Sequence, residues 1–214
     1  MAIRQHVFKP FRAIGRNIAG IAAVEFALSL PVLVGLTMYG AEAANMAYTS
    51  QKLGDIATLT ADSVSRIRLS ISNGDVTDAF GGIKILGDSI KLRDNGRIIV
   101  SSITPVLNAS NNVSNQKLRW QRCSGALVKS SAFATTENTN IGAAGMGPTG
   151  RQIAATKDSE LIFVEVYYTY RPLISSSFFG TPQMSAYAAM AVRERTANDL
   201  LSNGTNSPCN TYAA

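Results

Sequence analysis

The longest apolar run of the chain covers residues 21–40, where Glu25 is the only charged side chain. At 1.5 Å per residue, a helix of this length spans about 30 Å, the thickness of the hydrocarbon core of a bilayer. The run is also longer than the apolar core of a secretory signal peptide, which has roughly 7–15 residues. The pattern therefore predicts a transmembrane helix, in which we expect Pro31 to remove one backbone hydrogen bond and kink the span.

The helical pattern continues past the apolar run, but there it becomes amphipathic. Between Leu53 and Ile71 apolar residues recur in steps of three or four, which places them on one face of a helix. We predict that residues 41–72 continue the same helix outside the membrane and pack on a globular domain. Asn73-Gly74 is a stop signal, so the whole helix is expected over residues 16–72.

Residues 73–196 are predicted to form an exported domain of the α+β class. A short helix is expected over residues 75–80, with Asp75 as its N-cap. Gly81-Gly82 weakens the helix, which ends there or at Leu86. Beyond this helix the apolar period changes from 3.6 to 2, which is typical of strands. The strands are predicted at residues 97–103, 118–123, 161–170 and 184–195. The segment at residues 184–195 is ambiguous, because its alanines also suit a helix.

Polar segments separate these strands and end the chain. They predict a hairpin loop at residues 108–115, a long surface connection at residues 124–150 and a polar tail at residues 197–214. The predicted fold class is therefore α+β. In this fold a long N-terminal helix packs on a small antiparallel sheet of about four strands.

The charges before the apolar run set its orientation. The leader, residues 1–20, contains no acidic residue and carries the cations Arg4, Lys9, Arg12 and Arg16. Excess Lys and Arg marks the cytoplasmic side of a span, so we predict a single-pass protein with its N-terminus inside and its domain outside. The rest of the chain carries 16 cations against 14 acidic residues, so most of the net charge of +6 comes from the leader. With no basic stripe that contains interleaved aromatics, nucleic-acid binding is not expected.

The chemistry of the exported part is limited by its side chains. His6, in the leader, is the only histidine, so the domain cannot form a Ser-His-Asp triad, a Cys-His pair or a histidine metal site. Gly145-Met146-Gly147-Pro148 is a turn rather than a phosphate loop, because no Gly-Lys-Ser/Thr follows it. No pair of carboxylates stands out. We therefore expect no enzyme, no cofactor, no metal and no small-molecule substrate.

Cys123 and Cys209 are the two cysteines of the chain, and both fall on the exported side. Disulfides persist in oxidising compartments and the count is even, which favours a bridge over two free thiols. Such a bridge would tie the C-terminal tail to the domain and stabilise it by roughly 4–5 kcal/mol in the chain-entropy model. Two titratable thiols in the native protein would reject the bridge.

The start of the apolar run resembles a known processing site. Gly20, four further residues, Glu25 and Phe26 open an apolar helix after a basic leader, which resembles the prepilin-peptidase site of type IV pilin-like proteins. Residues 23–28 together with Pro31 are similar to the opening of TadE/TadG-like proteins, which are minor, pseudopilin-like components of the tight-adherence (Tad) pilus. A looser similarity extends to Trp120, Cys123, residues 165–172 and Arg193-Glu194-Arg195, where the family more typically ends in Arg-Pro-Arg.

This resemblance implies that an inner-membrane prepilin peptidase cuts between Gly20 and Ile21, which makes Glu25 the fifth residue of the mature chain. The new amino group of Ile21 would then lie about one helical turn from Glu25, within reach of an ion pair. In an assembly, the amino group could instead belong to a neighbouring subunit. Phe26 is part of the same processing and assembly motif.

The resemblance also implies a function and a set of partners. The chain is expected to be a non-catalytic minor pilin-like protein that acts in Tad pilus assembly and adherence. Its implied partners are prepilin peptidase, other pilin-like subunits, the inner-membrane pilus assembly platform and membrane lipid. Its implied location is the bacterial inner membrane, with a periplasmic or extracellular domain and with incorporation into the pilus left open.

Three alternatives stay open at this stage. An uncleaved, single-pass, membrane-anchored exported binding domain would keep Met1, and Glu25 would reach back toward the cytoplasmic surface. A soluble exported protein would begin at Ala44, because Ala41-Glu42-Ala43 fits the small-x-small pattern of signal peptidase. An exported enzyme has no support beyond the presence of carboxylates.

Overall fold

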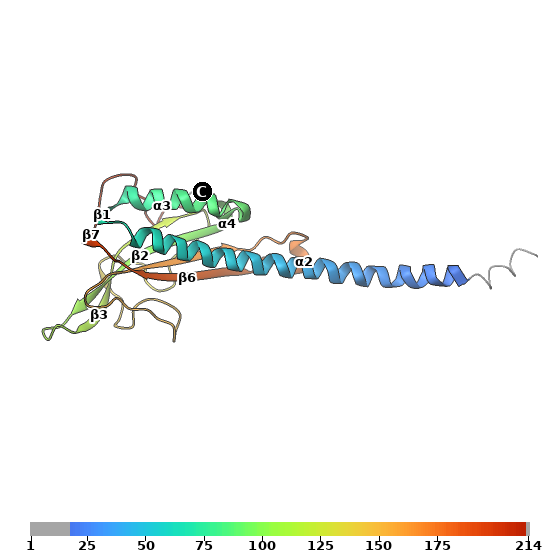
Figure 1. Ribbon diagram of the computed structural model, residues 1–214, viewed down its shortest axis with the longest axis horizontal. Coiled ribbons are helices and arrows are strands. Elements are labelled where there is room, and N and C mark those ends of the chain that lie inside the picture. The colour runs from blue at the N-terminus through green and yellow to red at the C-terminus, as the bar shows by residue number, and fades with distance from the viewer. Residues whose placement is uncertain (1–17, 213–214) are drawn as a thin grey trace, which may run out of the picture. The chain divides into compact units, whose positions relative to one another are not determined.

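The computed structural model describes residues 18–212, and the chain separates into two compact units, residues 1–45 and 46–214. One helix, α2 (Ile18–Ser65), contributes residues to both units (Figure 1). The helix continues through Pro31. Residues 1–17 of the predicted leader, which include its four cations, lie outside the described residues.

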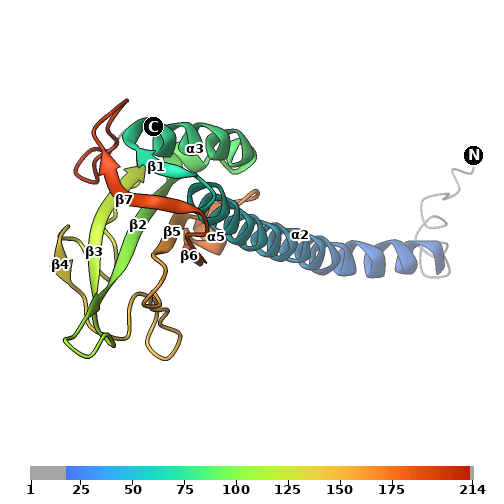
Figure 2. The same ribbon diagram turned by 60° about the vertical axis from the view of Figure 1, so that its left-hand side comes forward.

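The second unit contains a five-stranded antiparallel sheet with the strand order β4-β3-β2-β5-β6 (Figure 2). Its strands are β2 (Gly96–Leu107), β3 (Val113–Ser124), β4 (Thr139–Asn140), β5 (Leu161–Thr169) and β6 (Gln183–Ala191). The predicted α+β class, with a long N-terminal helix and an antiparallel sheet, is confirmed. The sheet has five strands where about four were expected, because the predicted connection at residues 124–150 contains β4.

Helices cover one face of this sheet. Leu53, Ile56 and Val64 of α2 form one buried cluster with Phe80 of α3 (Asn73–Leu86). Side chains alternate across a strand, so Ile162, Val164 and Val166 of β5 all point into this cluster. Burying each such side chain is worth about 1.5–3 kcal/mol, so this layer supplies much of the stability of the second unit.

The long connection between β3 and β5 covers the opposite face. Met146 is fully buried there beside Ile103 and Phe163, and Phe133 packs against the same cluster. The ring centroids of Phe133 and Phe163 lie 5.6 Å apart in an edge-to-face arrangement. Part of the segment predicted as a surface connection is therefore a second layer of the core.

The predicted end of the long helix at residue 72 is wrong, because α2 ends at Ser65. Residues Leu69–Ser72 form strand β1, which pairs in parallel with β7 (Arg195–Leu201). Leu69 has a left-handed backbone with φ of 62°, a conformation that a helix cannot contain. Ile71, which continued the helical spacing in the sequence, is buried as part of this strand.

The second helix, α3, begins at Asn73, the position predicted to stop a helix. Ser72 is its N-cap, because the Ser72 Oγ accepts the N–H of Asp75 and the Asp75 carboxylate accepts the N–H of Ser72. This capping box satisfies two backbone donors at the start of the helix. Asp75 is therefore not the N-cap, and α3 continues through Gly81-Gly82 to Leu86.

The C-terminal region is more ordered than a polar tail. The predicted strand at residues 184–195 ends at Ala191, and β7 begins at Arg195. After β7, the carbonyl of Asn203 accepts the N–H of Gly74 at 3.0 Å, and the carbonyl of Thr205 accepts the Thr77 Oγ1 at 2.8 Å. The chain beyond residue 201 thus lies along the first turn of α3.

Candidate functional site

The predicted processing site lies in α2. The Gly20–Ile21 bond is part of the described helix, which covers Ile18–Ser65. Gly20 is exposed, and the side chains of Ile21 and Phe26 are both 61% exposed.

Glu25 shares a helix face with the predicted new N-terminus. Residues four apart on a helix lie one turn apart on the same face, which places Ile21, Glu25 and Ser29 in one row. Glu25 is exposed in the first unit, and the hydroxyl of Ser29 donates to the carbonyl of Phe26 at 3.0 Å. The structure therefore brings Ile21 and Glu25 together along the helix, and the cleavage itself remains a prediction.

The surface around this motif is apolar on every side of the helix. None of the most apolar stretch of this helix is buried. An exposed apolar surface of this extent marks contact with a membrane or another protein. Among residues 18–212, one helix is long and apolar enough to cross a membrane. Its large exposed side chains are Ile21, Val24, Phe26, Leu28, Leu30, Val32, Leu33, Val34, Leu36, Met38 and Tyr39.

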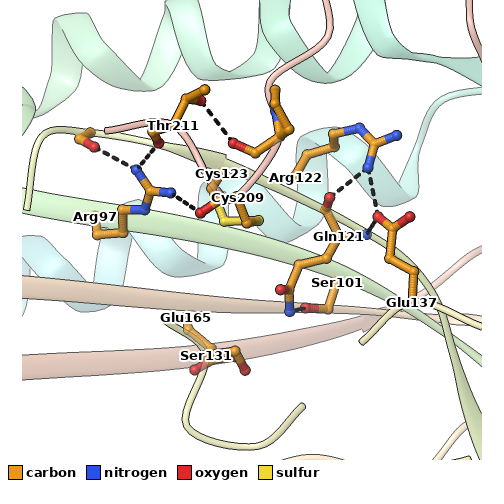
Figure 3. Close-up of a disulfide and its surroundings, with 12 residues drawn as sticks. Arg97, Ser101, Gln121, Arg122, Cys123, Ser131, Glu137, Glu165, Cys209 and Thr211 are labelled. Carbon is orange, nitrogen blue, oxygen red and sulfur yellow. Dashed lines mark hydrogen bonds and ion pairs between the residues drawn. A yellow bond between two sulfur atoms is a disulfide. The ribbon is translucent and has the colours of Figure 1, made fainter. Parts of the chain in front are cut away.

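A disulfide joins Cys123 and Cys209 in the second unit. The S–S distance is 2.01 Å, and the two residues are 86 positions apart in the chain (Figure 3). Cys123 is in β3, and its N–H also donates to the carbonyl of Ser207 at 2.9 Å. The C-terminal residues are therefore attached to the sheet by a covalent bond and by a backbone hydrogen bond.

Arg97 holds the same C-terminal residues from the neighbouring strand. Its guanidinium is fully buried and donates to the carbonyls of Gly125 at 2.8 Å, Thr211 at 2.7 Å and Cys209 at 2.9 Å (Figure 3). It also lies 4.3 Å from the ring centroid of Tyr212, a cation–π distance. Burial lowers the pKa of Arg97. This role was not predicted from the sequence, because a cation at the start of an apolar strand gives no sign of its distant acceptors.

A second buried charge, Glu165, fastens the connection between β3 and β5 to the sheet. Its carboxylate accepts the hydroxyls of Ser131 and Tyr167 and, at 3.1 Å, the N–H of Ala132. Burial raises the pKa of Glu165, and these hydrogen bonds act in the opposite direction. The ammonium of Lys129 lies 5.4 Å from the ring centroid of Tyr167, close to the same carboxylate. These contacts give the carboxylate a structural role.

Within residues 18–212, no group of three or more His, Cys, Asp or Glu side chains could hold a metal ion. The buried charges described above are each engaged by backbone or hydroxyl groups of the fold itself. The features with functional potential are therefore the exposed apolar helix and the Gly20–Glu25 motif on it.

The comparison with known families bears on this same part of the chain. The family model described as TadE-like protein matches residues 20–62. Neither the curated proteins nor the solved structures give a match to the chain. The matched segment starts at the glycine of the predicted cleavage site and includes the whole apolar run with Glu25. The chain is therefore TadE-like over residues 20–62, as the residues of its opening helix predicted.

Proposed function

We propose that this protein is a non-catalytic minor pilin-like subunit that acts in the assembly and adherence of a Tad-type pilus. The observation that carries the proposal is the TadE-like match over residues 20–62, which includes the exposed apolar run at residues 21–40 with Glu25 as its single carboxylate. In this proposal the N-terminus is cytoplasmic, and the second unit lies outside the inner membrane. Its partners are prepilin peptidase, other pilin-like subunits and the inner-membrane assembly platform.

Cleavage after Gly20 would give Glu25 a partner. A carboxylate near the bilayer centre costs about 2.5–3.5 kcal/mol, and somewhat less toward the edge of the membrane. The amino group released at Ile21 would lie one turn away on the same helix face, or it could come from a neighbouring subunit. An ion pair of either kind offsets much of the cost of burying the carboxylate.

Small side chains on the first part of α2 support assembly through this helix. Without a hydrophobic driving force inside lipid, helices associate by close packing, which small residues allow. Extracted from the membrane, the same surface would form the core of a helical bundle in a fibre. The small residues are Ala22, Ala23, Ala27, Ser29 and Gly35.

The first experiment is to identify the N-terminal residue of the mature protein, purified from native membranes, by intact mass and N-terminal sequencing. We expect Ile21. Gly20→Val should block the cut, because a side chain there obstructs the peptidase, while the matched variant Gly15→Val should still be cut at the same bond. An intact Met1 in the unaltered protein would instead support an uncleaved membrane anchor, and a start at Ala44 would support a soluble exported protein.

The role in assembly has its own test. Deleting the gene should reduce piliation and surface adherence, and restoring the unaltered chain should recover both. Gly20→Val supplied in place of the unaltered chain should fail to restore them, whereas Gly15→Val should succeed. Unchanged piliation and adherence after deletion would reject the assembly role.

A further inference from the structure

Several elements of the second unit end together at one end of its sheet. Gly96 of β2 pairs with Tyr168 of β5, and Thr169 of β5 pairs with Gln183 of β6. Directly before β2 lie the one-turn helices η1 (Asp88–Ile90) and α4 (Leu92–Asn95), which follow the end of α3. Figure 1 shows α4 beside the end of α3. We call this the entry end of the second unit.

The helix α2 enters the second unit at the entry end. Lys52 donates to the hydroxyl of Ser89 at 2.7 Å, and the hydroxyl of Tyr168 donates to the carbonyl of Ile90 at 2.7 Å. Lys52 and the last residues of β5 thus both lie against η1. Met46, the first residue of the unit, precedes Lys52 by less than two helical turns.

The other end of α2 lies at the opposite end of the sheet. The guanidinium of Arg195 donates to the carbonyl of Val64 at 2.7 Å. Arg195 begins β7, shortly after Val192, whose N–H donates to the carbonyl of Glu160 just before β5. The β2–β3 hairpin, which contains Leu107, is also at this distant end, because Ile103 pairs with Leu161 at the start of β5.

Large apolar side chains are exposed at the entry end. Phe178 is 86% exposed and Leu173 is 69% exposed, both in the connection between β5 and β6. Ile85, near the end of α3, is 79% exposed. Leu86, the last residue of α3, and Tyr48 of α2 are also exposed. These five residues define the apolar entry surface. They come from three separate segments of the chain, so the exposed apolar surface does not depend on the conformation of a single loop.

The β5–β6 connection is held in place by specific contacts. Arg171 donates from its Nε to the Oδ1 of Asn95 at 3.0 Å, and the N–H of Tyr170 donates to the carbonyl of Pro182 at 2.9 Å. Ser175 caps the one-turn helix α5 (Ser176–Phe179), whose position is shown in Figure 2. Phe178 is therefore presented to solvent by an ordered turn. Charged side chains lie on the same or adjoining segments: the exposed or partly exposed cations Lys52, Lys84, Lys91 and Arg171, and the exposed carboxylates Asp88 and Asp94.

We propose that the apolar entry surface inserts into the interfacial layer of the bilayer that α2 crosses, on the side of the exported domain. The apolar run ends at Gly40, six residues before Met46, which is about 9 Å of helix. The headgroup layer is itself several ångströms thick, so chain length alone keeps the entry end close to the membrane surface. The proposal rests on residues 21–40 spanning the membrane and goes beyond the proposed pilus role.

The composition of the entry surface fits lipid as its partner. Aromatic and aliphatic side chains at the level of the headgroups, with Lys and Arg beside them, are typical of interfacial membrane contacts. The four cations outnumber the two carboxylates, Asp88 and Asp94, and anionic headgroups attract Lys and Arg near a membrane surface. The entry surface would then fix the second unit against the membrane before any extraction of the helix.

The test uses the full chain reconstituted in vesicles of phosphatidylcholine and phosphatidylglycerol, whose acyl chains are brominated near the headgroup. Phe178→Trp places a fluorophore on the entry surface, and Leu107→Trp places one on an exposed side chain at the distant end. The single native tryptophan, Trp120, is buried and gives both variants the same background. We expect brominated lipid to quench roughly half of the added emission of Phe178→Trp and less than about a tenth of that of Leu107→Trp.

The outcomes separate this proposal from the function on which it rests. Flotation with the vesicles reports whether α2 is anchored, and a chain that does not float would overturn both proposals. A chain that floats without quenching of Phe178→Trp would overturn the lipid contact alone. A blue shift of the added emission that depends on protein concentration and not on brominated lipid would assign the surface to a second copy of the chain, which also overturns the proposal.

Discussion

The two parts of α2 use similar residues in opposite ways. Before Met46, in the first unit, Leu28 is 72% exposed, and apolar side chains surround the helix. After Met46, in the second unit, Ile56 is 1% exposed, and polar residues occupy the other face of the helix. In the first part of this continuous helix, the apolar surface needs a lipid or protein partner. In the second part, the apolar residues form one stripe, which is covered by the helix's own domain. The first part therefore depends on a partner to cover its apolar side chains, whereas the second part contributes to the stability of its own domain.

The largest expected effect separates these two parts directly. Ile56→Ala should lower the free energy of unfolding of the second unit by about 2–5 kcal/mol, because it leaves a cavity in a packed core. Leu28→Ala, the matched change in the first part, should alter it by less than about 0.5 kcal/mol. Chemical denaturation of the full chain in detergent, followed by the fluorescence of buried Trp120, measures both. Equal losses of unfolding free energy for the two variants would contradict this difference between the two parts of α2.

The sequence predicted the first part of α2 well because its signals are local. Twenty apolar residues and the Gly20–Glu25 spacing are contained in one short segment. The end of the helix was missed because Ile71 continues the helical spacing, while its strand partner Leu200 lies far away in the sequence. A local signal did exist, since Ser72 and Asp75 have the spacing of a capping box.

The contacts that complete the second unit could not be read from local pattern. β7 contains Arg195, Asn198 and Asp199, and it becomes a strand by pairing with β1. Met146 and Phe133 are isolated apolar residues in a polar segment, and only the sheet face that they cover explains them. Arg97 finds its acceptors through the fold of the C-terminal residues, which were predicted as a tail.

A smaller effect is expected within the second unit, where Arg97 and the Cys123–Cys209 disulfide are among the contacts that hold the C-terminal residues. Arg97→Met should cost about 2–4 kcal/mol of unfolding free energy, because it removes three hydrogen bonds to carbonyls of the fold. The exposed Arg93→Met is its control and should change little. Replacing both Cys123 and Cys209 by serine should cost roughly 2–4 kcal/mol.

These two losses should not be additive, because Arg97 and the disulfide restrain the same segment. The combined variant should therefore lose less than the sum of the separate losses, measured by denaturation with and without reductant. Vesicle flotation should stay unchanged in all of these variants, since the first part of α2 is not altered. Reduced flotation would show that the two parts of the helix depend on each other.

The smallest effect concerns pH and the buried Glu165. Burial raises the pKa of its folded-state carboxyl above the unfolded value of about 4.3, so the folded state holds the proton more tightly. Stability from this group is therefore fully present below the unfolded pKa, and it declines as pH rises through the raised folded pKa. Glu165→Gln cannot titrate and should flatten this part of the stability profile of the second unit. Unfolding curves from pH 4 to 8 measure the difference, and parallel profiles for the two proteins would show that the carboxyl titrates alike in both states.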